Sequence, residues 1–418
     1  MPIHNKRKRQ NWEKEFYKNG YPTEVIVISS ESPQPPASSG TTTSTSSSSA
    51  TNHDILKTLV LEPDPKRQKW NYNNDQSILA YHLFPSNNKS FTINSKNRTF
   101  ISNTNEPRLT TKESPFDDKD GHYIVRPNDL LTDQYKIMRL LGQGTFGKVV
   151  ECFDRVRRTF CAIKIIRAIP KYRDASKTEI KVLNTLKKHD PLNLNQCIHL
   201  IEWFDYRNHI CMVFELLGVS LFDHLKSNHF KPLTPHNIQH LAKQLLNSVA
   251  FLHNDLKLIH TDLKPENILL VNPANLEIRL IDFGSATFEH DYHSNIVSTR
   301  HYRAPEIILE RGWSYPCDLW SVGCILVELF IGEALFQTHD NEEHLVMMDI
   351  ILGPLPKHMQ TVRRSTRQYK NIKPLEKLIP PTSKETSYLL DLLRKFFVYE
   401  PSQRISAREA LKHPFFYI

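Results

Sequence analysis

The alternation of hydrophobic and polar residues predicts a strand-rich region directly after residue 116. Short runs rich in β-branched and aromatic residues are separated by Gly or charged residues, a pattern typical of an antiparallel sheet. These runs cover 121–125, 134–142, 147–154, 159–166, 199–206 and 209–216. One helical stretch, 176–188, interrupts them, with apolar residues at 180, 182, 183 and 186.

From Gly218 onward the apolar positions recur at helical spacing. The clearest helices are predicted at 235–254, 317–332 and 386–398. The chain therefore has an α+β, bilobal pattern. A β-rich lobe at about 117–217 is followed by an α-rich lobe at about 218–418, and the two are joined near 215–218.

Residues 1–116 show no sustained period, and 29–51 consist mainly of Ser, Thr and Pro. Such a composition buries too little apolar surface to offset the entropy of ordering, so we expect a disordered tail. Lys and Arg outnumber Asp and Glu by 15 to 10 in this tail and by 39 to 35 in the remainder. A basic tail suits an import receptor, an acidic partner or weak, salt-sensitive contact with nucleic acid.

The six cysteines form no C-x-x-C pair, which predicts reduced thiols in a reducing compartment. The sequence has no run of 18 apolar residues and no apolar stretch of signal-peptide type at its start. We therefore expect an intracellular monomer without a membrane partner.

A glycine-rich turn, Gly142-Gln-Gly144-Thr-Phe-Gly147, joins two of the predicted strands. The G-x-G-x-x-G spacing is shared by nucleotide flaps and dinucleotide sites. Here it does not open a helix, which favours a flap whose backbone N–H groups approach phosphates because Gly has no Cβ. A structural hairpin and a dinucleotide site are the alternatives for this motif alone.

Lys164 lies in the next strand, within an apolar run where its charge needs a partner. Glu179, 15 residues later at the start of the predicted helix, is the candidate. Together they would hold the α- and β-phosphates of a nucleotide. The alternative is an edge lysine whose ammonium group reaches water.

The stretch 259–267 (IHTDLKPEN) carries a carboxylate, a lysine and an amide within six residues, Asp262 to Asn267. Phosphoryl transfer needs a base to orient the hydroxyl, a cation near the γ-phosphate and an oxygen ligand for Mg²⁺. Asp282, in Asp-Phe-Gly after the run 278–281, offers a second oxygen ligand. A polar loop broken by Pro is the alternative for 259–267.

These motifs, followed by Ala304-Pro-Glu306, resemble those of the eukaryotic protein kinases over essentially all of 117–418. The resemblance implies transfer of the ATP γ-phosphoryl group to protein Ser or Thr, with Mg²⁺. It makes Asp262 the catalytic base and Lys264 the γ-phosphate contact. It makes Asn267 and Asp282 the metal ligands.

The resemblance also assigns the nucleotide site. Lys164–Glu179 is similar to the ion pair of the active state, Phe214 to the gatekeeper, and Glu215 and Leu217 to residues whose backbones bind adenine. The other implied contacts with ATP are Leu141, Gly142, Gln143, Gly144, Thr145, Phe146, Gly147, Lys148, Val149, Ala162, Asp223, Asn267 and Asp282. Asp318 is implied to anchor the catalytic loop, and Glu306 to pair with Arg404.

Within the kinases, 298–306 (STRHYRAPE), 312–318 (GWSYPCD) and the form HTDLKPEN resemble the LAMMER (Cdc2-like, dual-specificity) family of the CMGC group. This family phosphorylates Ser in Arg/Ser-rich splicing factors and autophosphorylates on Tyr. Its name motif here reads LVMMDI (345–350), where Leu345, Met347 and Met348 are expected to pack. Only 14 residues separate Asn267 from Asp282, so the insert typical of the family is missing.

Thr261 occupies the position where most kinases have Arg before the catalytic Asp. Without that cation a phosphorylated activation loop lacks its usual clamp, so we expect activity without phosphorylation of Ser298 or Thr299. Arg-rich substrates need acidic residues near the cleft, and Asp223 and Glu266 are the candidates. Their alternative roles are binding the ATP ribose and supporting the loop, respectively.

In the tail, Lys6–Arg9 and Pro65–Lys69 predict nuclear import, with solvated charge runs as the alternative and the cytoplasm as a further compartment. The segment 24–33 resembles a SUMO-interacting motif, which adds a strand to a sheet edge. Its alternatives are docking on the kinase domain or no role. For the whole chain, the rival class is a scaffold or pseudokinase, against which Lys164, Asp262, Asn267 and Asp282 argue.

Overall fold

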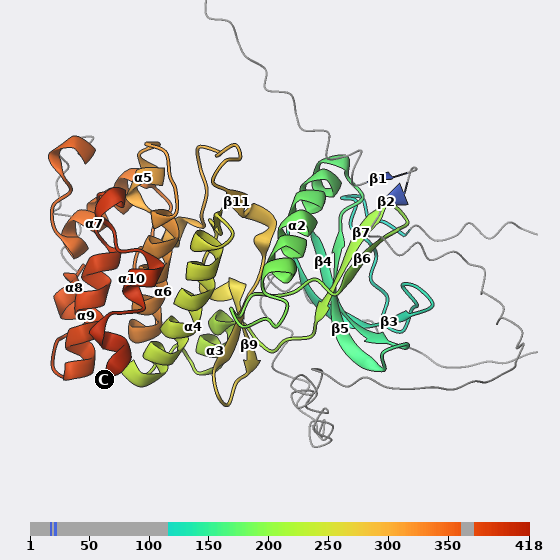
Figure 1. Cartoon of the computed structure of the whole chain (residues 1–418), viewed down its shortest axis with the longest axis horizontal. Coiled ribbons are helices and arrows are strands. Elements are labelled where there is room, and N and C mark those ends of the chain that lie inside the picture. The colour runs from blue at the N-terminus through green and yellow to red at the C-terminus, as the bar shows by residue number, and fades with distance from the viewer. Residues whose placement is uncertain (1–16, 19–20, 23–115, 361–371) are drawn as a thin grey trace, which may run out of the picture. The chain divides into compact units, whose positions relative to one another are not determined.

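The computed structural model describes residues 17–18, 21–22, 116–360 and 372–418 (Figure 1). The predicted tail motifs at 6–9, 24–33 and 65–69 lie outside these residues. Within the tail, β1 (Tyr17–Lys18) pairs antiparallel with β2 (Tyr21–Pro22), a short pairing that the sequence pattern did not predict.

The first lobe is built on a five-stranded antiparallel sheet in the order β3-β4-β5-β7-β6. The strands are β3 (Tyr135–Gln143), β4 (Gly147–Asp154), β5 (Thr159–Ile166), β6 (Glu202–Tyr206) and β7 (His209–Glu215). β4 and β5 have the predicted bounds, β3 is shifted by one residue at both ends, and β7 ends one residue earlier than predicted. β6 begins three residues later than predicted.

The predicted strand at 121–125 is wrong. The segment 116–124 instead folds back on itself as a tight loop, here called the 116–124 hairpin, with a bridge between Asp117 and Tyr123. The Asp118 carboxylate accepts from the N–H groups of Asp120 and His122 at 3.0 and 2.9 Å, which holds the turn. These side-chain hydrogen bonds replace the ladder of a longer strand.

Helix α2 (Pro170–His189) packs against the sheet (Figure 1). It begins six residues before the predicted start at 176, because Pro170 occupies the first helical turn, where its missing N–H costs nothing. Glu179 therefore lies in the middle of the helix and not at its start. The side chain of Glu179 is buried on the inner face.

The second lobe is mainly helical. Its helices are α3 (Leu221–Ser227), α4 (Pro235–Asn254), α5 (Pro305–Ile308), α6 (Pro316–Ile331), α7 (Asn341–Leu352), α8 (Leu375–Leu378), α9 (Lys384–Phe396) and α10 (Ala407–Ala410). α4 has the predicted bounds, and Thr234 caps it by accepting from the N–H of Asn237.

Two small antiparallel pairs carry the loops of the site. β8 (Leu258–Ile259) pairs with β11 (Thr287–Phe288), and β9 (Ile268–Asn272) pairs with β10 (Glu277–Leu280). β9 and β10 are joined by a short connection over residues 273–276.

Two apolar cores hold the domain. A small one fills the outer part of the sheet, and a larger one runs from α2 into the helical lobe. Leu345, Met347 and Met348 are buried in the larger core, as predicted. All six cysteines are buried free thiols. None of the described helices combines the length and apolar character needed to cross a bilayer.

Glu306 and Arg404 form the predicted pair. Two hydrogen bonds of 2.7 and 2.9 Å join the carboxylate and the guanidinium, and both side chains are almost completely buried. Arg404 also donates to the carbonyl groups of Val398 and Pro316. This bidentate pair fixes the end of the activation segment, defined here as 282–306, to the helical lobe.

Candidate active site

The turn between β3 and β4 has the geometry of a flap. A Cβ added to Gly142 or Gly144 meets no atom within 4 Å, so the backbone there is open to a ligand. A Cβ on Gly147 would overlap the carbonyl oxygen of Ile165, so this position requires Gly. The turn does not lead into a helix, as the flap prediction requires.

Lys148, one of the predicted nucleotide contacts, directs its side chain to the 116–124 hairpin. Its ammonium group donates to the carbonyl of Tyr123 at 3.0 Å and lies 3.4 Å from the Asp118 carboxylate. Side chains alternate between the two faces of a strand, so Lys148 faces away from its neighbour Val149. Only the backbone of Lys148 is left for the flap.

Lys164 lies between two carboxylates. Its Nζ is 2.7 Å from Glu179 Oε1 and 3.3 Å from Asp282 Oδ1. Burial alone would lower the pKa of Lys164, but the two carboxylates outweigh burial and raise it. The cation in turn lowers the pKa of Asp282, so both groups are charged at neutral pH. The predicted ion pair with Glu179 is present.

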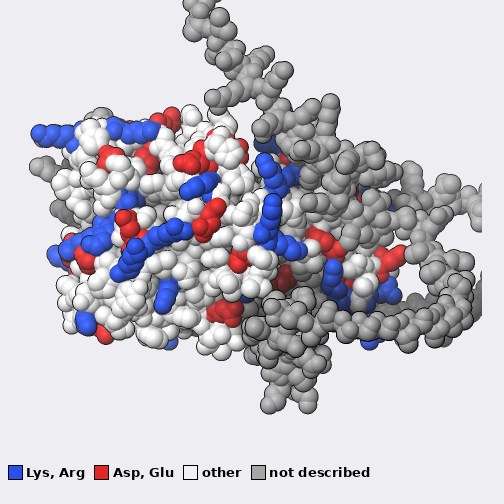
Figure 2. All heavy atoms as spheres, viewed as in Figure 1, with Lys and Arg blue, Asp and Glu red and all other residues white. Residues whose placement is uncertain are grey.

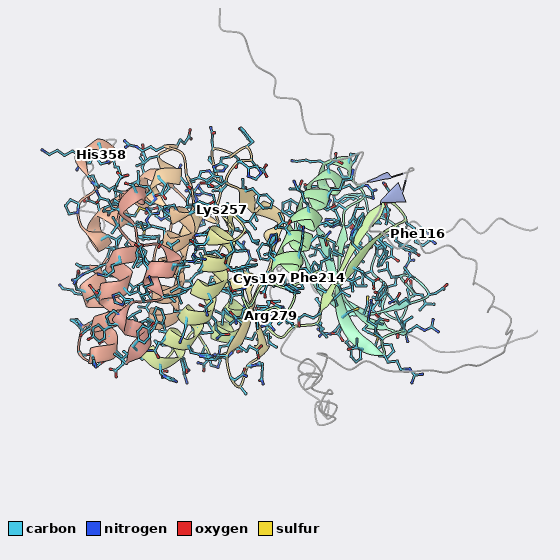
Figure 3. The ribbon with its side chains drawn as sticks, viewed as in Figure 1. Phe116, Cys197, Phe214, Lys257, Arg279 and His358 are labelled. Atoms are coloured by element: carbon cyan, nitrogen blue, oxygen red, sulfur yellow. The ribbon has the colours of Figure 1, made fainter. Side chains whose placement is uncertain are left out.

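The junction of the lobes contains the predicted adenine contacts. Ala162 on β5 lies directly opposite Phe214 on β7, and Phe214 is 7% exposed where the sheet meets the helical lobe (Figure 3). The chain then passes through Glu215 and Leu217 to Gly218, whose N–H donates to the carbonyl of Leu270. Asp223 follows in the first turn of α3, where it accepts a hydrogen bond from Ser220.

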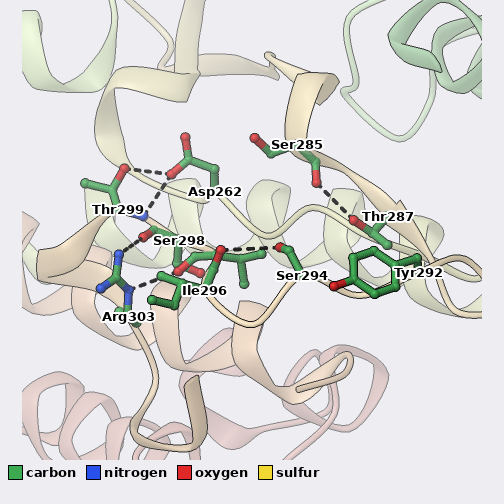
Figure 4. Close-up of a pocket in the computed structure, with 10 residues that line it drawn as sticks. Asp262, Ser285, Thr287, Tyr292, Ser294, Ile296, Ser298, Thr299 and Arg303 are labelled. Carbon is green, nitrogen blue, oxygen red and sulfur yellow. Dashed lines mark hydrogen bonds between the residues drawn. The ribbon is translucent and has the colours of Figure 1, made fainter. Parts of the chain in front are cut away.

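Asp262 is surrounded by donors (Figure 4). Its Oδ1 accepts from the backbone and the hydroxyl of Thr299 at 3.0 and 2.7 Å, and its Oδ2 is 2.7 Å from Lys264 Nζ. Burial alone would raise the pKa of Asp262, but the hydrogen bonds from Lys264 and Thr299 outweigh it and lower the pKa. The group is therefore a carboxylate that already accepts from an aliphatic hydroxyl.

Asn267 joins the metal-ligand candidates to Asp262. Its amide nitrogen donates to the carbonyl of Asp262 at 2.9 Å, which leaves the amide oxygen outside that bond. The N–H of Ile281, the residue before Asp282, donates to the carbonyl of Asn267 at 2.9 Å. The structure thus brings Lys164, Asp282, Asn267 and Asp262 into one site.

Asp318 fixes the loop that carries Asp262, as predicted. Its carboxylate accepts from the N–H groups of His260 and Thr261 at 2.8 and 2.9 Å and from the ring of His253 at 2.8 Å. Asp318 is 1% exposed. Buried charge-assisted bonds of this kind hold a backbone rigidly, so the position of Asp262 is determined by α6.

Hydroxyl groups next to Asp262 join the activation segment to the loop that carries this carboxylate. The Thr261 hydroxyl donates to the carbonyl of Ser285 at 2.9 Å, and the Ser298 hydroxyl donates to the carbonyl of Thr261 at 2.6 Å. Arg303 donates to the carbonyl of Ser298 at 2.8 Å. The activation segment is therefore bound to the catalytic loop through unmodified hydroxyl groups.

A pocket of about 410 Å³ opens beside Asp262 (Figure 4). Hydroxyl-bearing residues of the activation segment and Arg303 line it: Ser285, Thr287, Tyr292, Ser294, Ser298 and Thr299. Tyr292 is 87% exposed. The pocket places several hydroxyl groups near the carboxylate.

Glu328 on α6 was not predicted from the sequence. It is 4% exposed and accepts a 2.7 Å hydrogen bond from the hydroxyl of Tyr302. Burial, together with repulsion from Glu266, outweighs the hydrogen bond from Tyr302 and raises the pKa of Glu328 to about 7. The sequence signal that could have found it is the single acidic residue inside the apolar run 322–331, because a buried carboxylate costs free energy unless it has a partner.

Comparisons with known proteins agree with this geometry. The model of the protein kinase domain family matches residues 135–416. The dual specificity protein kinase lkh1 of Schizosaccharomyces pombe is 52% identical over 343 residues, 72% of this chain and 50% of the relative. The serine/threonine-protein kinase AFC1 of Arabidopsis thaliana is 48% identical, covering 72% of this chain and 74% of the relative. The dual specificity protein kinase CLK2 of Mus musculus is 46% identical, covering 73% and 68%.

The match thus spans half the length of the yeast relative. The fold and the matched family define a protein kinase, which uses ATP to phosphorylate proteins. The chain belongs to the protein kinase family and, within it, to the LAMMER (Cdc2-like) kinases of the CMGC group. The predictions of the fold class and of the family are confirmed.

Proposed function

We propose that this chain phosphorylates Ser and Thr in Arg/Ser-rich, splicing-related nuclear proteins and also autophosphorylates. The observation that carries the catalytic part is the convergence of Lys164, Asp262, Asn267 and Asp282, with Lys164 bound to Glu179 at 2.7 Å. This arrangement provides the cation, the base and the oxygen ligands that phosphoryl transfer uses.

Each side chain has a role in this proposal. Lys164 holds the α- and β-phosphates of ATP, and Glu179 keeps its ammonium group in place. The Asp262 carboxylate accepts a hydrogen bond from the substrate hydroxyl and aligns it, as it now does with Thr299 at 2.7 Å. Lys264, 2.7 Å from Asp262, balances charge on the γ-phosphoryl group.

The metal we propose is Mg²⁺. Asp282 is ionised and its side chain is 41% exposed, and Asn267 offers an amide oxygen, a set of hard oxygen ligands that fits this ion. When bound, Mg²⁺ would offset negative charge on the phosphates. Mg²⁺ sites with one or two protein ligands are common where phosphates supply the rest.

Three electrostatically linked carboxylates, those of Asp223, Glu266 and Glu328, support selection of arginine in the substrate. The pKa of Glu266 is raised by desolvation and by the carboxylates of Asp262 and Asp223, and Glu266 in turn acts on Glu328. Because these acids repel one another, a guanidinium placed among them is favoured. Lys/Arg and Asp/Glu are interspersed on the face of the helical lobe shown in Figure 2, so this attraction is local.

Autophosphorylation has a candidate acceptor in Tyr292, which is exposed and lines the pocket beside Asp262. We infer that the Thr261 and Ser298 hydrogen bonds make activity independent of phosphorylation at Ser298.

In the tail we infer nuclear import through 6–9 and 65–69. We also infer SUMO binding through 24–33, which titration of a 20–36 peptide with labelled SUMO tests. Absence of shifts at millimolar peptide would exclude it.

A peptide-library phosphorylation assay with the wild type beside Asp262→Asn tests the proposal. We expect the wild type to phosphorylate Ser or Thr flanked by Arg and the variant to lose activity by about 10²-fold or more. Binding of ATP without phosphorylation by the wild type would instead indicate a scaffold. Phosphorylation without a preference for Arg would contradict the proposed substrate class alone.

A further inference from the structure

The 116–124 hairpin precedes the matched kinase domain, which begins at residue 135. It nevertheless docks on the sheet lobe through several contacts. The N–H of Ala168 donates to the carbonyl of Gly121 at 2.9 Å. Tyr123 is 4% exposed in the smaller apolar core. The hairpin is therefore part of the folded lobe and not an extension of the tail.

One end of the hairpin is fixed at β7. His209 is fully buried, with Nδ1 2.6 Å from the carbonyl of Ile166 and Nε2 2.8 Å from the Asp117 carboxylate. Arg207 adds a cation–π contact with Phe116, at the outer side of the lobe in Figure 3, with 3.3 Å from Cζ to the ring centroid.

The other end of the hairpin reaches the flap through Arg167. The Nε of Arg167 donates to the carbonyl of Asp120 at 2.7 Å, and Nη2 donates to the same oxygen. Its Nη1 donates to the carbonyl of Thr145 at the tip of the flap, at 3.3 Å. The guanidinium also lies over the ring of Tyr172, 4.9 Å from the centroid.

Further contacts strengthen the same connection. The backbone N–H of Arg167 donates to the carbonyl of Phe146 at 3.0 Å, and the Phe146 ring packs edge-on against Tyr172 on α2. At the base of the flap, Lys148 binds the carbonyl of Tyr123 and the carboxylate of Asp118. Both the tip and the base of the flap are thus held by the hairpin.

We propose that Arg167 is a positioning residue that couples the 116–124 hairpin to the tip of the glycine-rich flap and thereby sets the affinity for ATP. A planar guanidinium can bridge two carbonyl groups from different segments, which a single ammonium does less well. With the bridge in place, the flap is already partly ordered, so a smaller loss of conformational entropy opposes nucleotide binding. The inference rests on the proposed role of the flap in binding ATP.

Steady-state kinetics of the full chain test this inference. The variants are Arg167→Ala, Arg167→Lys, the hairpin double variant Asp117→Ala/Asp118→Ala, their combination with Arg167→Ala, and the control Asp133→Ala. Asp133 is exposed on the same lobe, and its side chain takes no part in these contacts. We measure kcat, KM for ATP and KM for a peptide substrate.

We expect Arg167→Ala to raise KM for ATP about tenfold, because charge-assisted hydrogen bonds are lost. KM for the peptide should stay within about twofold, a split that general loss of stability does not produce. Arg167→Lys should recover part of the effect. The hairpin double variant loses the His209 and Lys148 contacts that dock the hairpin, so it should also raise KM for ATP. The combined variant should be little worse than Arg167→Ala, because Arg167 can hold the flap only through a docked hairpin.

The inference is overturned if the hairpin double variant keeps KM for ATP within about twofold of the wild type, or if the two effects multiply in the combined variant. If Arg167→Ala shows no cooperative unfolding in a thermal scan, it is not folded, and the KM values for ATP of Arg167→Lys and the hairpin double variant then test the inference. If the wild type has no kinase activity, the proposed function itself is wrong. If the wild type is active and KM for ATP is the same in all variants, only this inference is wrong.

Discussion

Glu328→Gln removes a buried carboxyl whose titration is expected to act on both stability and substrate choice. The folded-state pKa is about 7 against an ordinary 4.5. Between these values the unfolded chain releases its proton first, so the free energy of unfolding falls as pH rises from about 4.5 to about 7 and then levels off. At about 1.36 kcal/mol per pKa unit, the loss is about 3 kcal/mol.

Substrate binding should depend on the same proton, but it should strengthen as pH rises, whereas the free energy of unfolding falls. A guanidinium beside Glu328 favours the ionised form, so an Arg-containing peptide binds better as pH rises toward 7 and above. We expect kcat/KM for such a peptide to rise between pH 6 and pH 8. Below pH 7 the rise should be at most about tenfold for each pH unit. A matched peptide with citrulline in place of arginine should lack this rise.

The assay compares the wild type, Glu328→Gln and the exposed control Glu310→Gln. Urea unfolding is measured from pH 4.5 to 8, and kcat/KM for both peptides is measured from pH 6 to 8. In Glu328→Gln, the drop in stability toward pH 7 and the pH-dependent preference for arginine should both disappear. If Glu328→Gln keeps the wild-type pH profiles, the assignment of the proton to this carboxyl is wrong.

Three further predictions concern other parts of the domain. Glu306→Ala leaves the buried guanidinium of Arg404 unpaired and should lower the free energy of unfolding by about 3–5 kcal/mol in urea titrations; an effect below about 1 kcal/mol would contradict the pairing energetics. Gly147→Ala should raise KM for ATP and lower the melting temperature, because the added Cβ overlaps the carbonyl oxygen of Ile165. Gly144→Ala should change the melting temperature little, because a Cβ there has open space. Equal shifts of the melting temperature in the two variants would refute the packing argument. Phosphatase-treated protein should keep activity within about threefold of the untreated wild type, and loss of activity that phosphorylation of Ser298 or Thr299 restores would refute this expectation.

Much of the fold follows from local pattern. β4 and β5 have their predicted bounds because alternating side chains and short polar turns mark both ends of each strand. The start of α2 was missed because 170–175 is mostly polar, and only Pro170 signals it. Residues 121–125 were read as a strand because their apolar residues resemble one, whereas the Asp118 side chain decides the turn.

The site shows the same division. Motif order predicted which residues meet around Asp262, because each lies on a short segment with its own spacing signal. The sequence did not reveal the side-chain direction of Lys148, which depends on the docked hairpin. The electrostatic link between Glu266 and Glu328 was also missed, because 62 positions separate them in the printed sequence and only the packing of α6 brings them together.

The central claim is that Lys164, Asp262, Asn267 and Asp282 act on a single nucleotide. Calorimetric titration of ATP, with and without Mg²⁺, into the wild type and Asp282→Asn tests it most directly. We predict that Mg²⁺ strengthens ATP binding to the wild type and that Asp282→Asn loses most of this gain. Binding of ATP to Asp282→Asn with the full wild-type dependence on Mg²⁺, or no ATP binding by the wild type, would contradict the claim.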